Sequence, residues 1–377
     1  MRIGFDGKRA VQNFTGLGNY SRYVADILCH FYPENDYVLY APKKRENKRM
    51  NLLTGQYRQL TLAYPATSFW KKLSSLWRVW GITSQLEKEG IELFHGLSNE
   101  LPLNIHKSRI KSIVTIHDLI FLRYPQYYQS IDRKIYTYKF RKACENADKI
   151  IAISECTKRD IIRYFNIPDD KIEVVYQGCD VSFTHPVTEE KKEEVRKKYQ
   201  LPDDYILNVG SIEERKNILA AVQALPMLPQ HIHIVIVGRR TGYTEKVEQF
   251  IKDNGLGERV HIISNVPFND LPAFYQSAEI FVYPSRFEGF GIPIIEALYS
   301  GIPVVAATGS CLEEAGGPDS IYVNPDDITG LADAFKQIYS NSDKRKNMVE
   351  KGREFAKRFS EKQQSEEIIN IYKKLIR

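Results

Sequence analysis

The sequence predicts an α/β protein with two doubly wound domains that face each other across a cleft. With 377 residues, 43% of them hydrophobic, the chain is too long for one ordinary core and has enough apolar surface for two. Short apolar runs rich in β-branched residues alternate with helical patterns of about 10–15 residues, which is typical of parallel sheets covered on both faces. A highly charged stretch separates these runs into two groups.

Each half of the chain has its own series of predicted strands. Those of the first half are RIGFD, YVLYA, IELFHG, IKSIVTI, KIIAIS and KIEVVY. Those of the second half are YILNVG, HIVIVG, VHIIS, IFVYP, IPVVAA and IYVN. The charged stretch HPVTEEKKEEVRKKYQLPDD places the hinge near residues 180–187, so the predicted domains are residues 1–183 and 184–359. The closing segment 360–377 has the spacing of an amphipathic helix and needs a surface on which to pack.

Composition limits the classes of protein to consider. The five cysteines are scattered, without a CxxC pair or a cysteine–histidine cluster at zinc spacing, so we expect no metal and a reducing, cytoplasmic environment. Met1 leads directly into RIGFD without a signal-peptide pattern, and no apolar run approaches the roughly 20 residues of a membrane span. The net charge of +6 is spread along the chain and suits a phosphorylated ligand or an anionic membrane surface.

The stretch SRFEGFGIPIIEALYSGIPVV follows a predicted strand and holds the most informative pattern. Glycines allow a tight turn, Pro293 suits the first turn of a helix, and Gly301 ends that helix. The free amides at the start of the helix would point into the cleft, with Glu288 on the loop before it and Glu296 about one turn inside it. A diphosphate flanked by two hydroxyl-rich groups would satisfy the amides and both carboxylates. That is the chemical outline of a nucleotide sugar.

Two cations follow another predicted strand. Arg215 and Lys216 come after YILNVG and before the helical pattern NILAAVQAL. Cations at the amino end of a helix oppose its dipole unless an anion is bound, so their position indicates a phosphate group. The alternative is a solvated basic turn neutralised by Glu213 and Glu214.

Four residues of the first half follow predicted strands and are weaker candidates. His117 ends a strand expected to be central, where it could donate to a sugar hydroxyl or a phosphate, or could order the following loop. Gly16 and Gly18 precede a helix after RIGFD, and either a ligand or a tight turn explains them. His95, at the end of IELFHG, fits a structural role better.

The run YPSRFEGFGIPIIEALYSGIPVVAA resembles the signature of the retaining family-four glycosyltransferases of GT-B architecture, in which two acids in an E-x7-E arrangement bracket the donor. Further segments follow in the family's order: TGLGNYSRYVADIL, TIHDLIFLRYP, IIAISECTKRDI, VGSIEERKN and VPFNDLPAFYQSAEIFVYPS. The resemblance implies two Rossmann-like domains. It also implies that the last helix, 360–377, packs back on the first domain.

The same resemblance implies roles for the site residues. Glu296 would hold the ribose diol, and Glu288 would hold the transferred sugar near its third and fourth hydroxyls. Arg215 and Lys216, which many relatives separate by several residues, would bind the diphosphate. His117 would face the sugar's sixth hydroxyl. The other residues expected at the donor are Gly16, Gly18, Gly210, Phe290 and Gly291.

The resemblance further implies a metal-independent reaction that keeps the anomeric configuration. No D-x-D pair stands at a strand end, and the Pro-Asp-Asp turns at 168–170, 202–204 and 325–327 are typical of loops. The variants TIHDLIFLRYP and EERKN look most like bacterial mannosyltransferases of surface polysaccharide synthesis, which implies GDP-mannose and a saccharide or polyprenyl-linked acceptor. A UDP-hexose or UDP-N-acetylhexosamine is the alternative donor.

Two other classes fit the sequence less well. A dehydrogenase with paired dinucleotide folds would need a GxGxxG turn and an acid roughly 20 residues later, and neither half has that pair. A nucleic-acid-binding protein would gather its basic residues on one motif, which this chain does not do.

The stretch FWKKLSSLWRVWGI contains all three tryptophans. On one continuous helix, Trp70, Trp77 and Trp80 share a face with Leu73 and Leu76, while Lys71, Lys72 and Arg78 point to the flanks and the opposite side. That face either packs against the sheet or, if exposed, gives the segment 68–81 a peripheral contact with the inner face of the plasma membrane.

Overall fold

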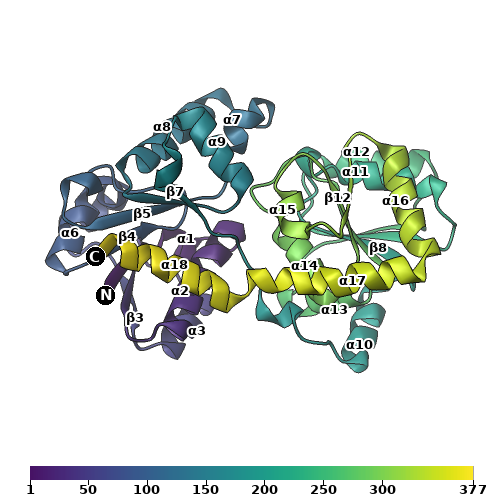
Figure 1. The fold of residues 1–377 in the computed structure, drawn as a ribbon, viewed down its shortest axis with the longest axis horizontal. Helices are drawn as coiled ribbons and strands as arrows, with labels where there is room; N and C mark the ends of the chain where they lie inside the picture. The colour runs from purple at the N-terminus through teal and green to yellow at the C-terminus, as the bar shows by residue number, and fades with distance from the viewer. Residues whose placement is uncertain (377) are drawn as a thin grey trace. The chain divides into compact units, whose positions relative to one another are not determined.

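The computed structural model describes residues 1–376, which divide into two α/β units. The first unit consists of Met1–Gln177 together with the segment from Glu361, and the second consists of Gly178–Ser360. Each unit has a parallel sheet with helices on both faces (Figure 1). The fold class predicted from the sequence is therefore confirmed.

The first unit has a seven-stranded sheet in the order β3-β2-β1-β4-β5-β6-β7, and all neighbouring strands are parallel. Its strands are β1 (Arg2–Asp6), β2 (Asp36–Tyr40), β3 (Leu60–Ala63), β4 (Leu93–Gly96), β5 (Lys111–Ile116), β6 (Lys149–Ala152) and β7 (Ile172–Val174). The order reverses between β1 and β4, as in a doubly wound sheet. The sequence patterns miss only β3, a short edge strand in which Thr61 is exposed and two of the four residues are half-buried.

Two hydrophobic cores cover the faces of this sheet. One face is packed by α2 (Gly16–Phe31), α3 (Lys48–Gln56) and α18 (Glu361–Ile376), and the other by α6 (Ile82–Lys88), α8 (Ser130–Asn146) and α9 (Glu155–Phe165). The short helices of the unit are α1 (Lys8–Gln12), α4 (Ser68–Lys72), α5 (Ser74–Leu76) and α7 (Ile120–Arg123).

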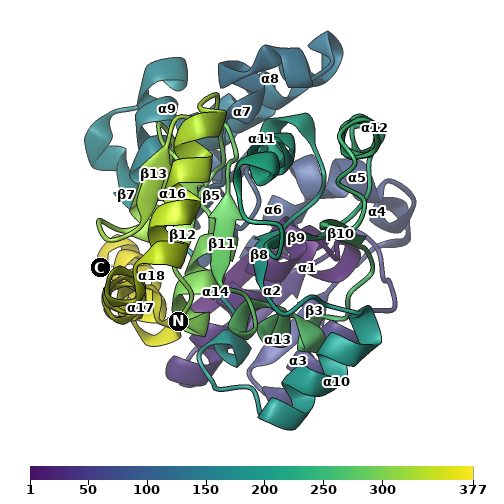
Figure 2. The ribbon, with the colours of Figure 1, turned by 90° about the vertical axis from the view of Figure 1, so that its right-hand side faces the viewer.

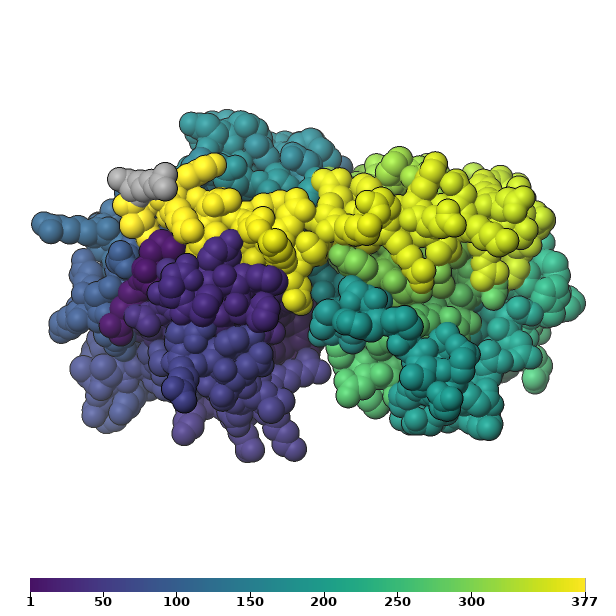
Figure 3. Space-filling model, turned by 60° about the horizontal axis from the view of Figure 1, so that its bottom comes forward, coloured from purple at the N-terminus to yellow at the C-terminus, as the bar shows by residue number. Residues whose placement is uncertain are grey.

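The last helix, α18, lies against the N-terminal part of the first unit, where Figure 3 shows the yellow end of the chain along the purple segments. It buries Ile368, Ile369 and Tyr372 in the same core as α2. The hydroxyl of Tyr372 lies 2.6 Å from Nδ1 of His95, whose Nε2 is 2.8 Å from Oγ1 of Thr115. His95 thus joins α18 to the sheet, which is a structural role.

The second unit has a six-stranded parallel sheet in the order β10-β9-β8-β11-β12-β13, which Figure 2 shows from β13 at the left to β10 at the right. Its strands are β8 (Tyr205–Val209), β9 (His233–Val237), β10 (Val260–Ile263), β11 (Ile280–Tyr283), β12 (Val304–Ala307) and β13 (Ile321–Val323). All six were predicted by the apolar runs. The four inner strands are mostly buried, as is typical of parallel strands covered on both faces, and the edge strands β10 and β13 are mostly half-buried but still apolar in sequence.

Helices cover both faces of the second sheet (Figure 1). On one side lie α11 (Ile218–Ala224), α12 (Thr244–Asp253) and α16 (Ile328–Ser340), and on the other α13 (Leu271–Gln276) and α14 (Ile292–Ser300). The remaining helices are α10 (Glu189–Tyr199), α15 (Leu312–Gly316) and α17 (Ser342–Ala356). None of the helices within residues 1–376 is long and apolar enough to span a membrane.

The tryptophan-rich stretch differs from the single helix that its spacing predicts. α4 ends before Leu73, α5 follows, and residues Trp77–Gly81 form a π-helical turn, η1. The break and the wider turn rotate the side chains apart, so Trp77 is fully buried while Trp80 is 49% exposed. Arg78 does not point to a flank, because its guanidinium pairs with the carboxylates of Asp6 and Glu100. The prediction of one shared face is therefore wrong.

Candidate active site

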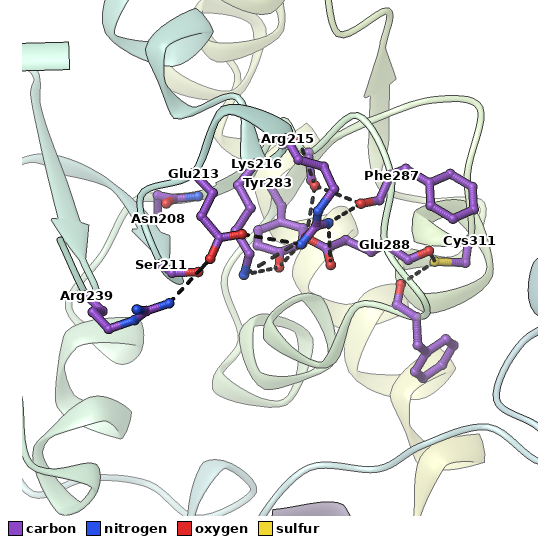
Figure 4. Close-up of polar contacts among 12 residues, drawn as sticks. Asn208, Ser211, Glu213, Arg215, Lys216, Arg239, Tyr283, Phe287, Glu288 and Cys311 are labelled. Atoms are coloured by element: carbon purple, nitrogen blue, oxygen red, sulfur yellow. Dashed lines mark hydrogen bonds and ion pairs between the residues drawn. The ribbon is translucent and has the colours of Figure 1, made fainter. Parts of the chain in front are cut away.

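The cations and the loop acid predicted to bind the donor lie in the second unit, at the point where its strand order reverses between the neighbouring strands β8 and β11. Arg215 and Lys216 belong to a short 3-10 turn, η6 (Glu214–Lys216), which follows β8. Glu288 lies on the loop that leaves β11 and leads into α14. Open α/β sheets bind ligands at the carboxyl ends of strands at such a reversal. The fold thus brings together the two charged motifs singled out in the sequence (Figure 4).

Glu288 is the centre of this cluster. One carboxylate oxygen lies 2.9 Å from Nη1 of Arg215, and the other lies 4.0 Å from Nζ of Lys216. The hydroxyls of Ser285 and Tyr283 donate to that second oxygen at 2.9 and 3.1 Å. Burial alone would raise the pKa of Glu288, but the two cations hold it below its ordinary value. Glu288 is therefore a carboxylate at neutral pH.

Arg215 is held in place by the loop that carries Glu288. It also donates to the carbonyl oxygen of Phe287, whereas the carboxylate of Glu213 is 3.8 Å away. Although burial works in the opposite direction, the ion pair with Glu288 raises the pKa of Arg215. The main partner of this cation is therefore Glu288. The alternative of a solvated basic turn would instead require its neighbours Glu213 and Glu214 to be the main partners.

Lys216 lies against the backbone at the end of β8. Its ammonium group donates to the hydroxyl of Tyr283 at 3.3 Å and lies 5.7 Å from the centre of that ring. Gly210 has a φ of 151°, and a Cβ atom there would come within 2.8 Å of the Lys216 Nζ. Gly210 is thus needed for its backbone conformation, and a Cβ atom there would also displace the tip of the Lys216 side chain. Tyr283 joins Lys216 to Glu288 (Figure 4).

Glu296 lies inside α14 and has a different partner. The buried hydroxyl of Tyr275 donates to its carboxylate at 2.6 Å. Burial raises the pKa of Glu296 to about 7, with a further contribution from Asp180 and an opposing one from the Tyr275 hydrogen bond. Around neutral pH, Glu296 exchanges between a carboxylate that accepts hydrogen bonds and a carboxylic acid that can also donate one.

The loop before α14 has the turn chemistry that the sequence predicts. Gly291 has a φ of 142°, Pro293 lies in the first turn, and Gly301 ends the helix with a φ of 75°. The side chain of Phe290 is buried, with its ring 5.6 Å from that of Phe359, and its carbonyl oxygen accepts from the thiol of Cys311 at 2.7 Å. Packing on both sides therefore fixes the backbone from which α14 starts.

In the first unit, His117 is buried, and both of its ring nitrogens have partners. Nε2 lies 2.9 Å from the carbonyl oxygen of Leu97, and Nδ1 lies 3.2 Å from the side-chain nitrogen Nε2 of Gln177. These contacts fit a neutral ring that donates through Nε2, and burial lowers the pKa of His117 to about 4. Its contact with a sugar hydroxyl stays a prediction, and it would require the ring to exchange one of these bonds.

Gly16 and Gly18 both lie in the first turn of α2, but their surroundings differ. A Cβ atom on Gly18 would come within 2.0 Å of the carbonyl oxygen of Asn13, so packing alone requires glycine there. A Cβ atom on Gly16 would meet open space. Of the two, Gly16 is therefore the one that local packing does not explain, and its place at a donor stays a prediction.

Each of the three Pro-Asp-Asp turns has at least one aspartate with a local partner. Asp169 lies 3.0 Å from Nζ of Lys158. Asp203 pairs with Arg196, Asp326 lies 2.6 Å from a guanidinium nitrogen of Arg286, and Asp327 caps α16. Within residues 1–376, no group of three or more His, Cys, Asp or Glu side chains is arranged to hold a metal ion.

Sequence reasoning missed three residues of this site. Tyr283 and Ser285 position Glu288, and Tyr275 positions Glu296. The first two stand in the quoted run YPSRFEG, so their closeness to Glu288 was available as a signal. Tyr275 has no such signal, because only the packing of α13 against α14 brings it to Glu296.

Family models match both halves of the chain. The family model "Glycosyltransferase Family 4" matches residues 21–183, and "Glycosyl transferases group 1" matches residues 191–355. The chain is 31% identical to the O-antigen chain mannosyltransferase B of Escherichia coli over 289 residues, which cover 75% of this chain and 74% of that protein. It is 29% identical to the O-antigen chain mannosyltransferase RfbU of Salmonella typhimurium over 225 residues, 60% of each chain.

Solved structures show the same fold. The crystal structure of Anabaena HepE in complex with UDP and glucose matches over 100% of both chains, with a TM-score of 0.77 at 17% identity. The resemblance noted in the sequence is thereby confirmed. This chain belongs to the family-4, or group 1, glycosyltransferases and has the GT-B fold.

Proposed function

We propose that the chain is a metal-independent, retaining hexosyltransferase that moves mannose from GDP-mannose to a saccharide or polyprenyl-linked acceptor of bacterial surface polysaccharide. The observation that carries the proposal is the cluster of Arg215, Lys216 and Glu288 where the order of the second sheet reverses. The choice of mannose rests on the similarity to the two O-antigen mannosyltransferases.

In this cluster, the diphosphate of a bound donor can replace Glu288 as the partner of the two cations. Without a donor, Glu288 neutralises Arg215. A diphosphate would compete for Arg215 and Lys216, and Glu288 would then be available to accept hydrogen bonds from the sugar. The two cations and the first amides of α14 would stabilise the charge that develops on the leaving diphosphate. Glu296 would accept from the ribose diol, and the leaving phosphate would take the proton of the acceptor hydroxyl.

A panel of nucleotide sugars tests the donor. The unfolding temperature and donor hydrolysis would be measured with GDP-mannose, UDP-glucose and UDP-N-acetylglucosamine in excess EDTA. GDP-mannose at 100 times its Kd should stabilise the protein by about 2.7 kcal/mol. A larger shift with a UDP-sugar would assign that donor instead. Activity that returns only with manganese or magnesium would contradict the metal-independent reaction.

The segment 68–81 gives the proposed enzyme a means of peripheral contact with the inner face of the plasma membrane. Phe69, Leu73, Leu76 and Trp80 are exposed there, and the neighbouring Lys71 and Lys72 suit an anionic surface. Lipid-linked acceptors would be found at that surface.

A further inference from the structure

The first unit contains a cavity of about 330 Å³. Its apolar lining comes from three places in the chain: Val79 from η1, Leu101 and Leu103 from the segment after β4, and Ile135 and Tyr138 from α8. The volume lies at the lower end of the range of about 300–1,000 Å³ found for ligand sites. The segment after β4 leaves the sheet where the strand order reverses, which is where such sheets bind ligands.

Hydrogen bonds join the segments that form the walls of this cavity. The amide of Leu103 donates to the carbonyl oxygen of Val79 at 2.9 Å, and Nδ2 of Asn104 donates to that of Trp80 at 3.1 Å. Nδ2 of Asn146, at the end of α8, donates to the carbonyl oxygen of Leu103 at 3.0 Å. The wall that carries Val79 is the π-helical turn, a rare conformation that occurs frequently at functional sites.

The charged groups of the cavity favour an anion. Lys134 and Lys139 line it, together with Glu100. Glu100 pairs with Arg78, whose Nη1 lies 2.5 Å away and which also pairs with Asp6, and its other oxygen is 3.7 Å from Nζ of Lys139. Arg78 and Lys139 together balance Asp6 and Glu100, and Lys134 adds a positive charge. Helix α8 as a whole carries five basic and two acidic side chains. The lining therefore combines an apolar wall with a positive charge.

The apolar surface continues beyond the cavity. Trp80 follows Val79 and is 49% exposed, and Ile131, one turn before Ile135, is 66% exposed. Exposed apolar patches mark ligand-binding grooves as well as protein and membrane interfaces. A soluble saccharide needs no such surface, whereas a hydrocarbon chain longer than the cavity does.

We propose that the cavity between η1 and α8 binds a single-chain lipid phosphate, with the start of the hydrocarbon chain against Val79, Leu103 and Ile135 and the phosphate at Lys134 and Lys139. This proposal rests on the proposed function in one respect: it makes the acceptor of the transferase a saccharide linked to such a lipid. Binding itself requires neither a donor nor a transfer reaction, so it can be measured separately.

Farnesyl diphosphate is a suitable soluble probe, and isothermal titration calorimetry would measure its binding to the full chain. Farnesol and inorganic pyrophosphate, which each carry one half of the probe, should bind at least about tenfold more weakly. Ile135→Asn should weaken the affinity for the probe about tenfold, and Lys134→Gln several-fold. The matched substitutions Leu52→Asn and Lys142→Gln, which change an exposed leucine on α3 and another lysine of α8, should leave it unchanged.

The variant Arg215→Ala distinguishes binding of the probe in the cavity from binding at the nucleotide site. The variant should bind farnesyl diphosphate as the wild type does, and a loss of binding would place the probe at the nucleotide site. Equal affinity for pyrophosphate, no binding of the probe, or full binding by Ile135→Asn would each overturn the lipid site. Wild-type binding of the probe by a chain that transfers no sugar would instead contradict the proposed function and leave the lipid site standing.

Discussion

Glu288 and Glu296 differ in charge although both are carboxyl groups at the start of α14. Glu288 faces two cations and accepts from two hydroxyls, so it stays ionised. Glu296 faces Tyr275 in buried surroundings, and its pKa rises to about 7. A carboxylate with fixed charge suits an interaction that must persist during the reaction, whereas Glu296 can gain or lose a proton near neutral pH.

Substitutions of these two acids should therefore have different kinetic effects. Glu296→Ala should raise the KM for the donor about tenfold, because hydrogen bonds to the ribose are lost. Glu288→Gln should lower kcat more than it changes donor affinity, by about 100-fold, because its charge positions Arg215 as well as the sugar. Steady-state kinetics of donor hydrolysis would measure both, with Glu213→Gln as the control. Full activity of both variants would remove the basis of this site.

The pKa of Glu296 also predicts how stability depends on pH. Burial raises this pKa from 4.5 to about 7 in the folded protein. Between these values the folded protein holds a proton that the unfolded chain has released, so the free energy of unfolding falls as the pH rises through this window. The loss attributable to Glu296 approaches about 3 kcal/mol by pH 7.5.

Urea unfolding of the wild type and of Glu296→Gln, each at pH 5 and pH 7.5, would test this dependence. The glutamine cannot ionise, so the variant should lack the part of the decrease that comes from residue 296. Equal pH dependence of the two proteins would show that Glu296 ionises near its ordinary value.

The segment 68–81 shows how an element can divide between core and surface. A continuous helix would keep its apolar residues together, but the break at Leu73 and the π-helical turn separate them. Trp77 enters the core beside Ile82 and Leu86, and its indole nitrogen donates to Gln85 at 3.1 Å. Trp80 remains half-exposed. Trp77 thus fits the interpretation that this stretch packs in the core, and Trp80 fits the interpretation that it contacts a membrane.

Trp77 and Trp80 should therefore respond differently to the same change. Trp77→Ser should destabilise the first unit by about 3–5 kcal/mol, because it empties a fully buried site. Trp80→Ser should leave stability within about 0.5 kcal/mol and weaken adsorption to vesicles that contain an anionic phospholipid. Thermal unfolding and vesicle sedimentation would separate the two effects. Unchanged adsorption of Trp80→Ser would rule out this membrane contact.

The connectivity of the whole chain makes the first unit depend on both ends of the sequence. The chain leaves this unit after Gln177 and returns to it at Glu361. On its return, α18 completes the core over α2 and places Tyr372 against His95. Because His95 is buried, its pKa is lowered to about 3 and its ring stays neutral. The first unit is therefore complete only when the last helix has been added.

A substitution in α18 should accordingly affect one unit. Ile369→Ala should destabilise the first unit by about 2–5 kcal/mol, because Ile369 is fully buried in its core. Hydrogen exchange should increase in α2 and β1 and remain unchanged in β8 and β11. Lys374→Ala, an exposed change on the same helix, serves as the control. Equal loosening of both units would show that they unfold together.

The sequence by itself determined the elements and the local chemistry of the site. Buried parallel strands are continuous apolar runs, so all but the edge strand β3 could be predicted. The turn before α14 could be predicted because Gly291, Pro293 and Gly301 act through their own backbone conformations. The family could be recognised for the same reason, since its motifs are local in the sequence.

Tertiary structure alone decided which of these residues meet. Arg215 pairs with Glu288 because β8 and β11 are neighbours in the sheet, and this order is not written in the periodicity of either strand. Arg78 is buried where it pairs with Asp6, the last residue of β1, and with Glu100, which follows the adjacent strand β4, although a helical pattern places it on a flank. Periodicity reports which side of an element is apolar, whereas a contact between distant residues depends on how the elements pack.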